Sequence, residues 1–184
     1  MAPEAIVSFF ATIHEEAARR KLRFLVIGGL AINHYGYSRE TADLDFFVSQ
    51  SERAEWMKML LDFGYTNYHD GGNFIQYAAP DENAWPVDLM LVQEKTFAPM
   101  LEAGVNAKLF GVRTKVPLLE HLIALKLHAL KNTRMHRFLK DFLDVENLIR
   151  INRLDVKSQK IRRLFDKYGT QDLYEKISQS LAGN

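Results

Sequence analysis

The segment from Gly28 to Val48 constrains the fold of this 184-residue chain more than any other. Gly28-Gly29 closes one apolar run, a short helical stretch follows, and Asp43-Leu44-Asp45 opens a second apolar run. Side chains at positions i and i+2 of a strand point to the same face. The segment therefore predicts a strand, a glycine turn, a short helix and a second strand that carries two neighbouring carboxylates.

Composition indicates a globular protein with one domain, or one domain with an appendage. Hydrophobic residues make up 47% of the chain and charged residues 26%, and the net charge is +1. The absence of cysteine excludes disulfides, zinc–thiolate sites and cysteine nucleophiles. No apolar run reaches the roughly 18 residues of a membrane span, and the N-terminus has no basic region or cleavage site typical of a signal peptide. We therefore expect a cytoplasmic protein without a membrane segment.

Periodicity predicts an α/β core over residues 1–116 and a helical region over residues 117–184 that packs on it. In the core we expect helices at 4–21, 30–35 and 52–63, and strands at 23–27, 44–48 and 86–92. Hairpin signals lie at 65–78, around Asp-Gly-Gly, and at 107–116, around Gly111. Four further helices are expected at 118–132, 137–152, 157–167 and 170–182.

Three acidic residues are candidate metal ligands. Asp43 and Asp45 would repel each other unless a cation lies between them. Asp88 stands inside the apolar run PVDLML, where a carboxylate is costly to bury unless it is paired or binds metal. Mg²⁺ prefers oxygen ligands and usually keeps substrate phosphate oxygens in its shell. The alternatives are surface carboxylates at a strand entry and an edge-strand Asp88 that faces solvent.

The glycine turn and the segment after it are a candidate phosphate site. Backbone N–H groups at Gly28 and Gly29 can bind phosphate. The stretch from Ser38 to Thr41 adds a hydroxyl and the Arg39 guanidinium near the same place. The alternatives are an ordinary tight turn at the glycines and a structural ion pair from Arg39 to Glu40 or Asp43.

The helical region carries a basic segment over residues 126–140, which contains two histidines and no acid. It is either a solvated helix face or a basic wall toward nucleotide phosphates or an RNA backbone. Lys126 lies within the apolar stretch LIALKLHAL, where its charge needs a partner or a ligand. Asp141 and Asp144 share one helix face, and a surface ion-pair lattice is their alternative interpretation.

These motifs together resemble the nucleotidyltransferase superfamily with the polymerase-β-like fold. The pattern GG-x-A-x-x-x-x-G-x-x-R-x-T-x-D-x-D-x-x-V runs from Gly28 to Val48, and VDLM around Asp88 resembles the strand of the third carboxylate. The helices with Lys126 and the Lys-Asp-x-x-Asp motif at 140–144 resemble bacterial AbiEii/MenT-like toxin-type members. The matches span about residues 22–149. Many members have Gly-Ser where this chain has Gly28-Gly29, so one phosphate-binding hydroxyl is lost.

The resemblance implies a fold and a set of roles. The fold would be α/β (α+β), a mixed sheet flanked by helices with a C-terminal helical bundle. The activity would be Mg²⁺- or Mn²⁺-dependent transfer of a nucleoside monophosphate from a nucleoside triphosphate, such as ATP, to an acceptor hydroxyl. The implied metal ligands are Asp43, Asp45 and Asp88, of which Asp88 is also the base. The implied triphosphate contacts are Gly28, Gly29, Ser38, Arg39 and Thr41, and Lys126 and Asp141 complete the catalytic set.

The sequence leaves the acceptor open. A tRNA or other RNA 3′ end suits the basic segment, and would suit a toxin with a cognate antitoxin. An aminoglycoside-like small molecule and a protein hydroxyl are the other candidates. The non-enzymatic alternative is a nucleotide-binding or toxin–antitoxin interaction module without turnover.

Overall fold

The computed structural model describes residues 3–132 and 135–183 and contains two compact units. Unit 1 consists of residues 1–31 and 40–117, and unit 2 consists of residues 32–39 and 118–184. The helix α2 (Gly28–His34) contributes its first turn to unit 1 and its remaining residues to unit 2.

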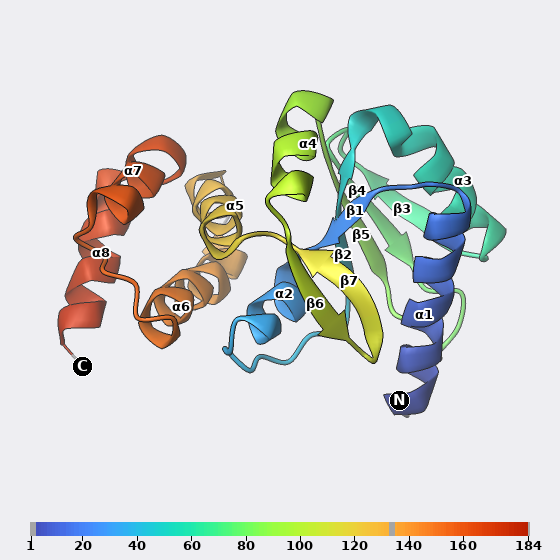
Figure 1. Ribbon diagram of the computed structural model, residues 1–184, viewed down its shortest axis with the longest axis horizontal. Coiled ribbons are helices and arrows are strands. Elements are labelled where there is room, and N and C mark those ends of the chain that lie inside the picture. The colour runs from blue at the N-terminus through green and yellow to red at the C-terminus, as the bar shows by residue number, and fades with distance from the viewer. Residues whose placement is uncertain (1–2, 133–134, 184) are drawn as a thin grey trace. The chain divides into compact units, whose positions relative to one another are not determined.

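Unit 1 is built on a five-stranded mixed sheet with the strand order β1-β2-β5-β4-β3 (Figure 1). The central strands β2 (Leu44–Ser49) and β5 (Val87–Val92) are parallel, and every other neighbouring pair is antiparallel. The outer strands are β1 (Phe24–Val26), β4 (Phe74–Ala78) and β3 (Thr66–Asp70). A sheet of this kind confirms the mixed α/β fold class.

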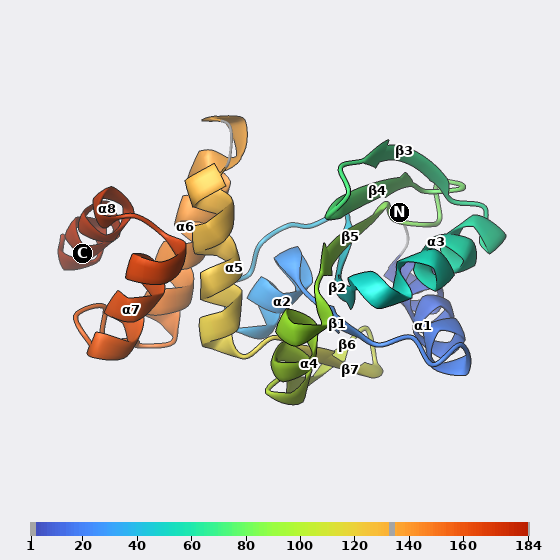
Figure 2. The ribbon, with the colours of Figure 1, turned by 90° about the horizontal axis from the view of Figure 1, so that it is seen from above.

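Helices cover both faces of this sheet because β2 is apolar on both sides. Phe46 stacks on Trp56 of α3 (Arg53–Asp62), with ring centroids 5.6 Å apart. The next residue, Phe47, faces Phe97 of α4 (Glu94–Glu102) on the opposite side, at 6.0 Å. The helices α1 (Pro3–Arg19) and α3 lie side by side in both views (Figures 1 and 2), and a short 3-10 turn (Gln50–Glu52) precedes α3.

The α-helix α4 was not predicted from the sequence. It contains Pro99, which has no backbone N–H and normally ends or kinks a helix. The buried Phe97 secures the helix against β2, so packing prevails over the local signal. The predicted hairpin after it forms from β6 (Val105–Leu109) and β7 (Val112–Val116), with positive φ at both turn residues, Phe110 and Gly111.

Unit 2 is a helical bundle. Its helices are α5 (Leu119–Asn132), α6 (Met135–Ile151), α7 (Gln159–Tyr168) and α8 (Gln171–Ala182). The side chains of Ser158 and Thr170 accept hydrogen bonds from backbone N–H groups and cap α7 and α8. Within the described part of the chain, no helix is long and apolar enough to cross a membrane.

Candidate active site

Three carboxylates gather at one end of the central strands of unit 1. Each of Asp43, Asp45 and Asp88 offers an oxygen within 4.8 Å of the oxygens of the other two. Asp45 pairs directly with Asp88 across the parallel strands β2 and β5, and Asp43 lies two residues before Asp45, directly ahead of the first residue of β2. Asp88 is only 5% exposed. Three acids held this close repel one another in the absence of a cation, and hard oxygen ligands suit Mg²⁺ or Mn²⁺.

Polar neighbours hold two of these carboxylates in place. The Gln76 amide donates to Asp88 at 3.2 Å from Oδ1 and 3.1 Å from Oδ2, because Gln76 stands opposite Asp88 in the antiparallel pairing of β4 with β5. The Thr41 hydroxyl donates to Asp43 Oδ1 at 2.6 Å. Both contacts restrict how a carboxylate can rotate, which is a common device around metal ligands.

Tyr68 on β3 is an exposed aromatic residue close to the acidic cluster. Partial burial, followed by the negative charges of Asp88 and Asp43, raises the pKa of the Tyr68 phenol above its ordinary value. The side chain is 59% exposed. It therefore offers a flat ring and a neutral hydroxyl beside the carboxylates at physiological pH.

Gly28 makes room for Asp45. Its backbone has φ +61°, a conformation that L side chains rarely adopt, and a Cβ at this position would lie 1.8 Å from Asp45 Oδ2. Backbone pairing fixes the approach, since the Ile27 N–H donates to the Asp45 carbonyl at 2.9 Å. Glycine is thus required here both by the local conformation and by the carboxylate that fills the space.

We expect Gly28→Ala to lower the free energy of unfolding by about 2–5 kcal/mol. The left-handed backbone contributes about 1–2 kcal/mol, and the clash with Asp45 adds about 1–3 kcal/mol of overpacking. Urea denaturation measures the loss. Gly72→Ala is the matched control, because Gly72 has φ +81° but nothing within 4 Å of the added Cβ. Equal losses in the two variants would contradict the steric role of Gly28.

Unit 2 holds a second, separate group of predicted residues as a buried ion network. Lys126 Nζ lies 2.7 Å from Asp141 Oδ1 and 2.8 Å from Asp144 Oδ2. Arg39 Nε lies 3.2 Å from Asp144 Oδ1, and Asp144 is fully buried. Two anions and two cations thus compensate one another inside unit 2. The charge of Lys126 has the partner that its apolar surroundings require, and the pairs are buried rather than a surface lattice.

The other predicted site residues are Gly29 and Ser38. Gly29 is buried in the first turn of α2, and Ser38 is exposed in the segment after that helix. The Asn33 side chain brackets the Arg39 backbone, accepting from its N–H at 2.8 Å and donating to its carbonyl at 3.0 Å. Of the basic segment 126–140, residues 133–134 lie outside the described residues.

Sequence reasoning did not identify Gln76 or Tyr68. Both lie on the predicted hairpin 65–78, but their position beside the acids depends on which strand pairs with β4. The alternation of FIQYA indicates only that Gln76 and Phe74 share a face. A polar residue in an otherwise apolar strand next to an acidic strand was the available signal.

Comparisons with known proteins identify the family to which this chain belongs. A family model described as uncharacterised nucleotidyltransferase matches residues 5–179. The solution structure of the antibiotic-resistance factor ANT(2'')-Ia is similar in fold, with a TM-score of 0.64, 13% identity, and 97% of each chain covered. No curated protein matches.

Two further solved structures share the fold. An antigenic nucleotidyltransferase-like protein from Paracoccidioides brasiliensis has a TM-score of 0.59 and 14% identity, and the match covers 97% of this chain and 93% of that one. The lincosamide antibiotic adenylyltransferase LnuA, solved with lincomycin, has a TM-score of 0.56 and 14% identity over 78% of this chain and 96% of that one. The family match extends over nearly the whole chain, and this protein therefore belongs to the nucleotidyltransferases and is an enzyme of that class.

Proposed function

We propose that the protein transfers a nucleoside monophosphate from a nucleoside triphosphate to an acceptor hydroxyl in a reaction that depends on Mg²⁺ or Mn²⁺. The observation that carries this proposal is the cluster of three carboxylates, whose ligand oxygens lie within 4.8 Å of one another. A module that only binds nucleotide has no need of three mutually repelling acids, whereas a metal-dependent transferase does.

The proposed reaction forms one bond and breaks another. The acceptor oxygen attacks the α-phosphorus, the bond from that phosphorus to the bridging oxygen breaks, and pyrophosphate leaves. Asp88 takes the proton of the acceptor hydroxyl. Asp43, Asp45 and Asp88 would hold the metal, which when bound supplies charge stabilisation at the phosphate oxygens. Gln76 and Thr41 keep two of the carboxylates oriented for these roles.

The resemblance assigns further triphosphate contacts, and these stay predictions. Gly28, Gly29, Ser38, Arg39 and Thr41 are its candidate phosphate contacts, and Lys126 and Asp141 its candidate catalytic partners. Thr41 donates to a carboxylate, and Arg39, Lys126 and Asp141 belong to the buried ion network. For these four residues a structural role is established by geometry, and a role toward nucleotide needs a separate test.

The acceptor has two main candidates. A small hydroxyl compound is supported by the likeness in fold to ANT(2'')-Ia, which was solved in complex with adenylyl-2''-tobramycin, and to LnuA, solved with lincomycin. An RNA 3′ end is supported by the basic segment 126–140 and by the resemblance to toxin-type members. A cognate antitoxin is expected only if the acceptor is an RNA 3′ end.

Labelled nucleoside triphosphates test the proposal and the acceptor together. The protein is incubated with each α-labelled triphosphate, Mg²⁺, and either total cell RNA or a panel of aminoglycosides and lincosamides. We expect label in one acceptor class, release of pyrophosphate, and loss of both on chelation of the metal. Nucleotide binding without transfer to any acceptor, including proteins of a cell lysate, would instead favour the non-enzymatic alternative.

Gln76→Leu should lower the rate of transfer by about 10–100-fold, the usual effect of removing a group that orients a metal ligand. The reason is that Asp88 would lose the amide that fixes its carboxylate. The measurement is the rate as a function of Mg²⁺ concentration, where we expect the half-saturating concentration to rise. Gln93→Leu makes the same change at an exposed residue whose side chain makes no helix-cap bond. Equal metal dependence in both variants would refute the orienting role.

A further inference from the structure

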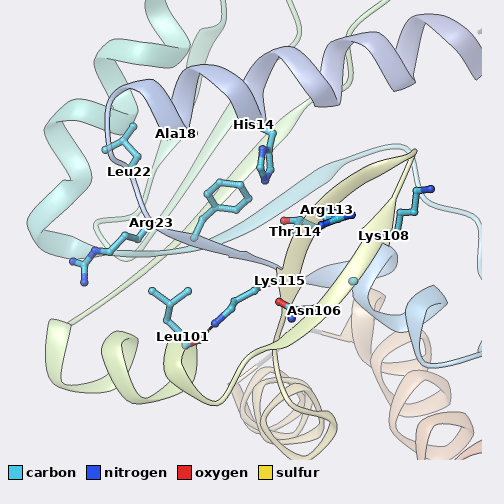
Figure 3. A pocket seen from close by; sticks show the side chains of 12 residues that line it. His14, Ala18, Leu22, Arg23, Leu101, Asn106, Lys108, Arg113, Thr114 and Lys115 are labelled. Carbon is cyan, nitrogen blue, oxygen red and sulfur yellow. Dashed lines mark hydrogen bonds between the residues drawn. The ribbon is translucent and has the colours of Figure 1, made fainter.

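Unit 1 contains an open groove of about 820 Å³ that shares no lining residue with the acidic cluster. Its walls are α1, the start of β1, the end of α4 and the hairpin β6–β7 (Figure 3). Phe24 in its lining pairs with Val48 at the far end of β2 from Asp45. Val48 is three positions along the strand from Asp45, or roughly 10 Å. The groove is therefore a different surface from the proposed transfer site.

The charge of the groove has one sign. Arg23, Lys108, Arg113 and Lys115 line it, and no Asp or Glu does. Two of these cations have internal partners, since Arg23 pairs with Glu52 and Glu94, and Lys115 donates to the Leu101 carbonyl at 3.2 Å. Lys108 and Arg113 are exposed and have no ion pair among the side chains that the structure describes. They are the groove's available cations.

Lys108 and Arg113 stand directly opposite each other in the antiparallel hairpin. Like charges at directly opposed positions destabilise a strand pair, and no acidic side chain lines the groove beside them. The next pair on the same face, Asn106 with Lys115, adds an amide and a third cation. These opposed cations lower the stability of the hairpin, and a bound anion would relieve their repulsion. Such a pair is therefore expected on a surface that binds anions.

The spacing of the cations favours a polyanion over a single compact anion. In Figure 3 the labelled basic side chains are spread from Arg23 at one end of the groove to Lys108 at the other, and they do not converge on one point. A small anion is bound by converging donors, whereas a chain of phosphates is bound by cations in a row.

Two aromatic rings in the lining of the groove favour nucleic acid over an acidic peptide as the ligand. The rings of Phe24 and His14 both line the groove, edge to face with centroids 5.5 Å apart. Burial lowers the pKa of His14 below its ordinary value, against the opposing effects of Glu15 and of a hydrogen bond to the Arg113 backbone. The imidazole is thus a neutral ring at physiological pH. Aromatic rings together with cations that follow a phosphate backbone are the usual elements of a surface that binds unpaired bases.

We propose that this groove binds the phosphate backbone of single-stranded RNA, with Lys108 and Arg113 as phosphate contacts and Phe24 and His14 as an apolar surface for bases. Binding here does not depend on nucleotide transfer, because the groove and the acidic cluster have separate residues. The inference therefore stands or fails independently of the proposed function.

Fluorescence anisotropy with a labelled 12-nucleotide RNA of mixed sequence tests the proposal. Lys108→Gln/Arg113→Gln should weaken binding at least about fivefold at low salt, and make the slope of log K against log salt shallower by about 1.4, since each phosphate contact on a single strand contributes about 0.7. The control Lys58→Gln/Lys157→Gln makes the same change in net charge at two exposed lysines outside the groove, and we expect parental affinity and slope.

A stability measurement separates lost binding from lost folding. Because the double variant removes an opposed like-charge pair, its thermal midpoint should be no lower than that of the parent. Unchanged RNA affinity and salt slope in this variant would overturn the proposal. So would polyglutamate that displaces the RNA as effectively as unlabelled RNA does, since the groove would then recognise acidic peptides.

Discussion

Asp45→Asn is expected to reduce nucleotidyl transfer by at least about 1,000-fold, because charge stabilisation by a bound metal is worth several kcal/mol and each 1.4 kcal/mol is about tenfold in rate. Asn keeps the shape that fits over Gly28 but removes one of the three carboxylate charges. The assay is incorporation of α-labelled nucleotide into the acceptor, with circular dichroism to verify the fold.

For the same variant we expect no loss of thermal stability, in contrast to its loss of transfer activity. In metal-free buffer, removal of one charge relieves repulsion among three close acids, so Asp45→Asn should unfold at a temperature no lower than the parent. Asp166→Asn, a change of the same kind at an exposed position on α7, should alter neither quantity. Turnover retained by Asp45→Asn at the parental rate would refute the role of this carboxylate.

Lys126→Ala should lower the free energy of unfolding by about 3–5 kcal/mol, the usual result of removing one partner from a buried ion pair. The lysine ammonium is the shared partner of two carboxylates, Asp141 at 2.7 Å and Asp144 at 2.8 Å. Asp144 would keep Arg39, but Asp141 would be left buried without its cation. Chemical denaturation monitored by far-UV circular dichroism measures the loss.

Two comparisons sharpen this test. Lys160 pairs with Glu120 at 2.5 Å in the same unit, but its side chain is 69% exposed, so Lys160→Ala should cost less than about 1 kcal/mol. Lys126→Met/Asp141→Asn removes the stranded charge together with the lysine, and should recover much of the stability lost in Lys126→Ala. Equal losses for Lys126→Ala and Lys160→Ala would mean that the network is not effectively buried.

The strands and helices were largely predictable from sequence because local signals agree with the fold. The Asp-Gly-Gly hairpin and the last two helices lie close to where residue type and periodicity predict them, whereas α2 begins at Gly28 and includes both glycines that were expected to form a turn before it. The helix α4 was not predicted, since Pro99 argues against a helix and only the contact of Phe97 with β2 supports one. Prediction from local sequence fails where packing against a part of the chain far away in sequence determines the secondary structure.

The acidic cluster was predictable and its surroundings were not. A spacing of two residues is enough to predict Asp43 beside Asp45, whereas the position of Gln76 depends on the pairing of three strands. Lys126 shows the converse. Its apolar context indicated that it needs a partner or a ligand, and the structure supplies the partner through two acids on α6. Sequence alone could not choose between these options because they differ only in tertiary contacts.

The cross-strand row Asp45–Asp88–Gln76 has a consequence for which length changes this chain can tolerate. Adjacent residues of a strand face opposite sides of the sheet, so one residue inserted before Asp45 in β2 or before Asp88 in β5 would turn that carboxylate to the other face. Residues 79–86 connect β4 to β5 outside the strands, so a residue inserted there would not turn either carboxylate to the other face. Natural variation in length should therefore concentrate in that connection, while the two acidic strands keep a fixed residue count.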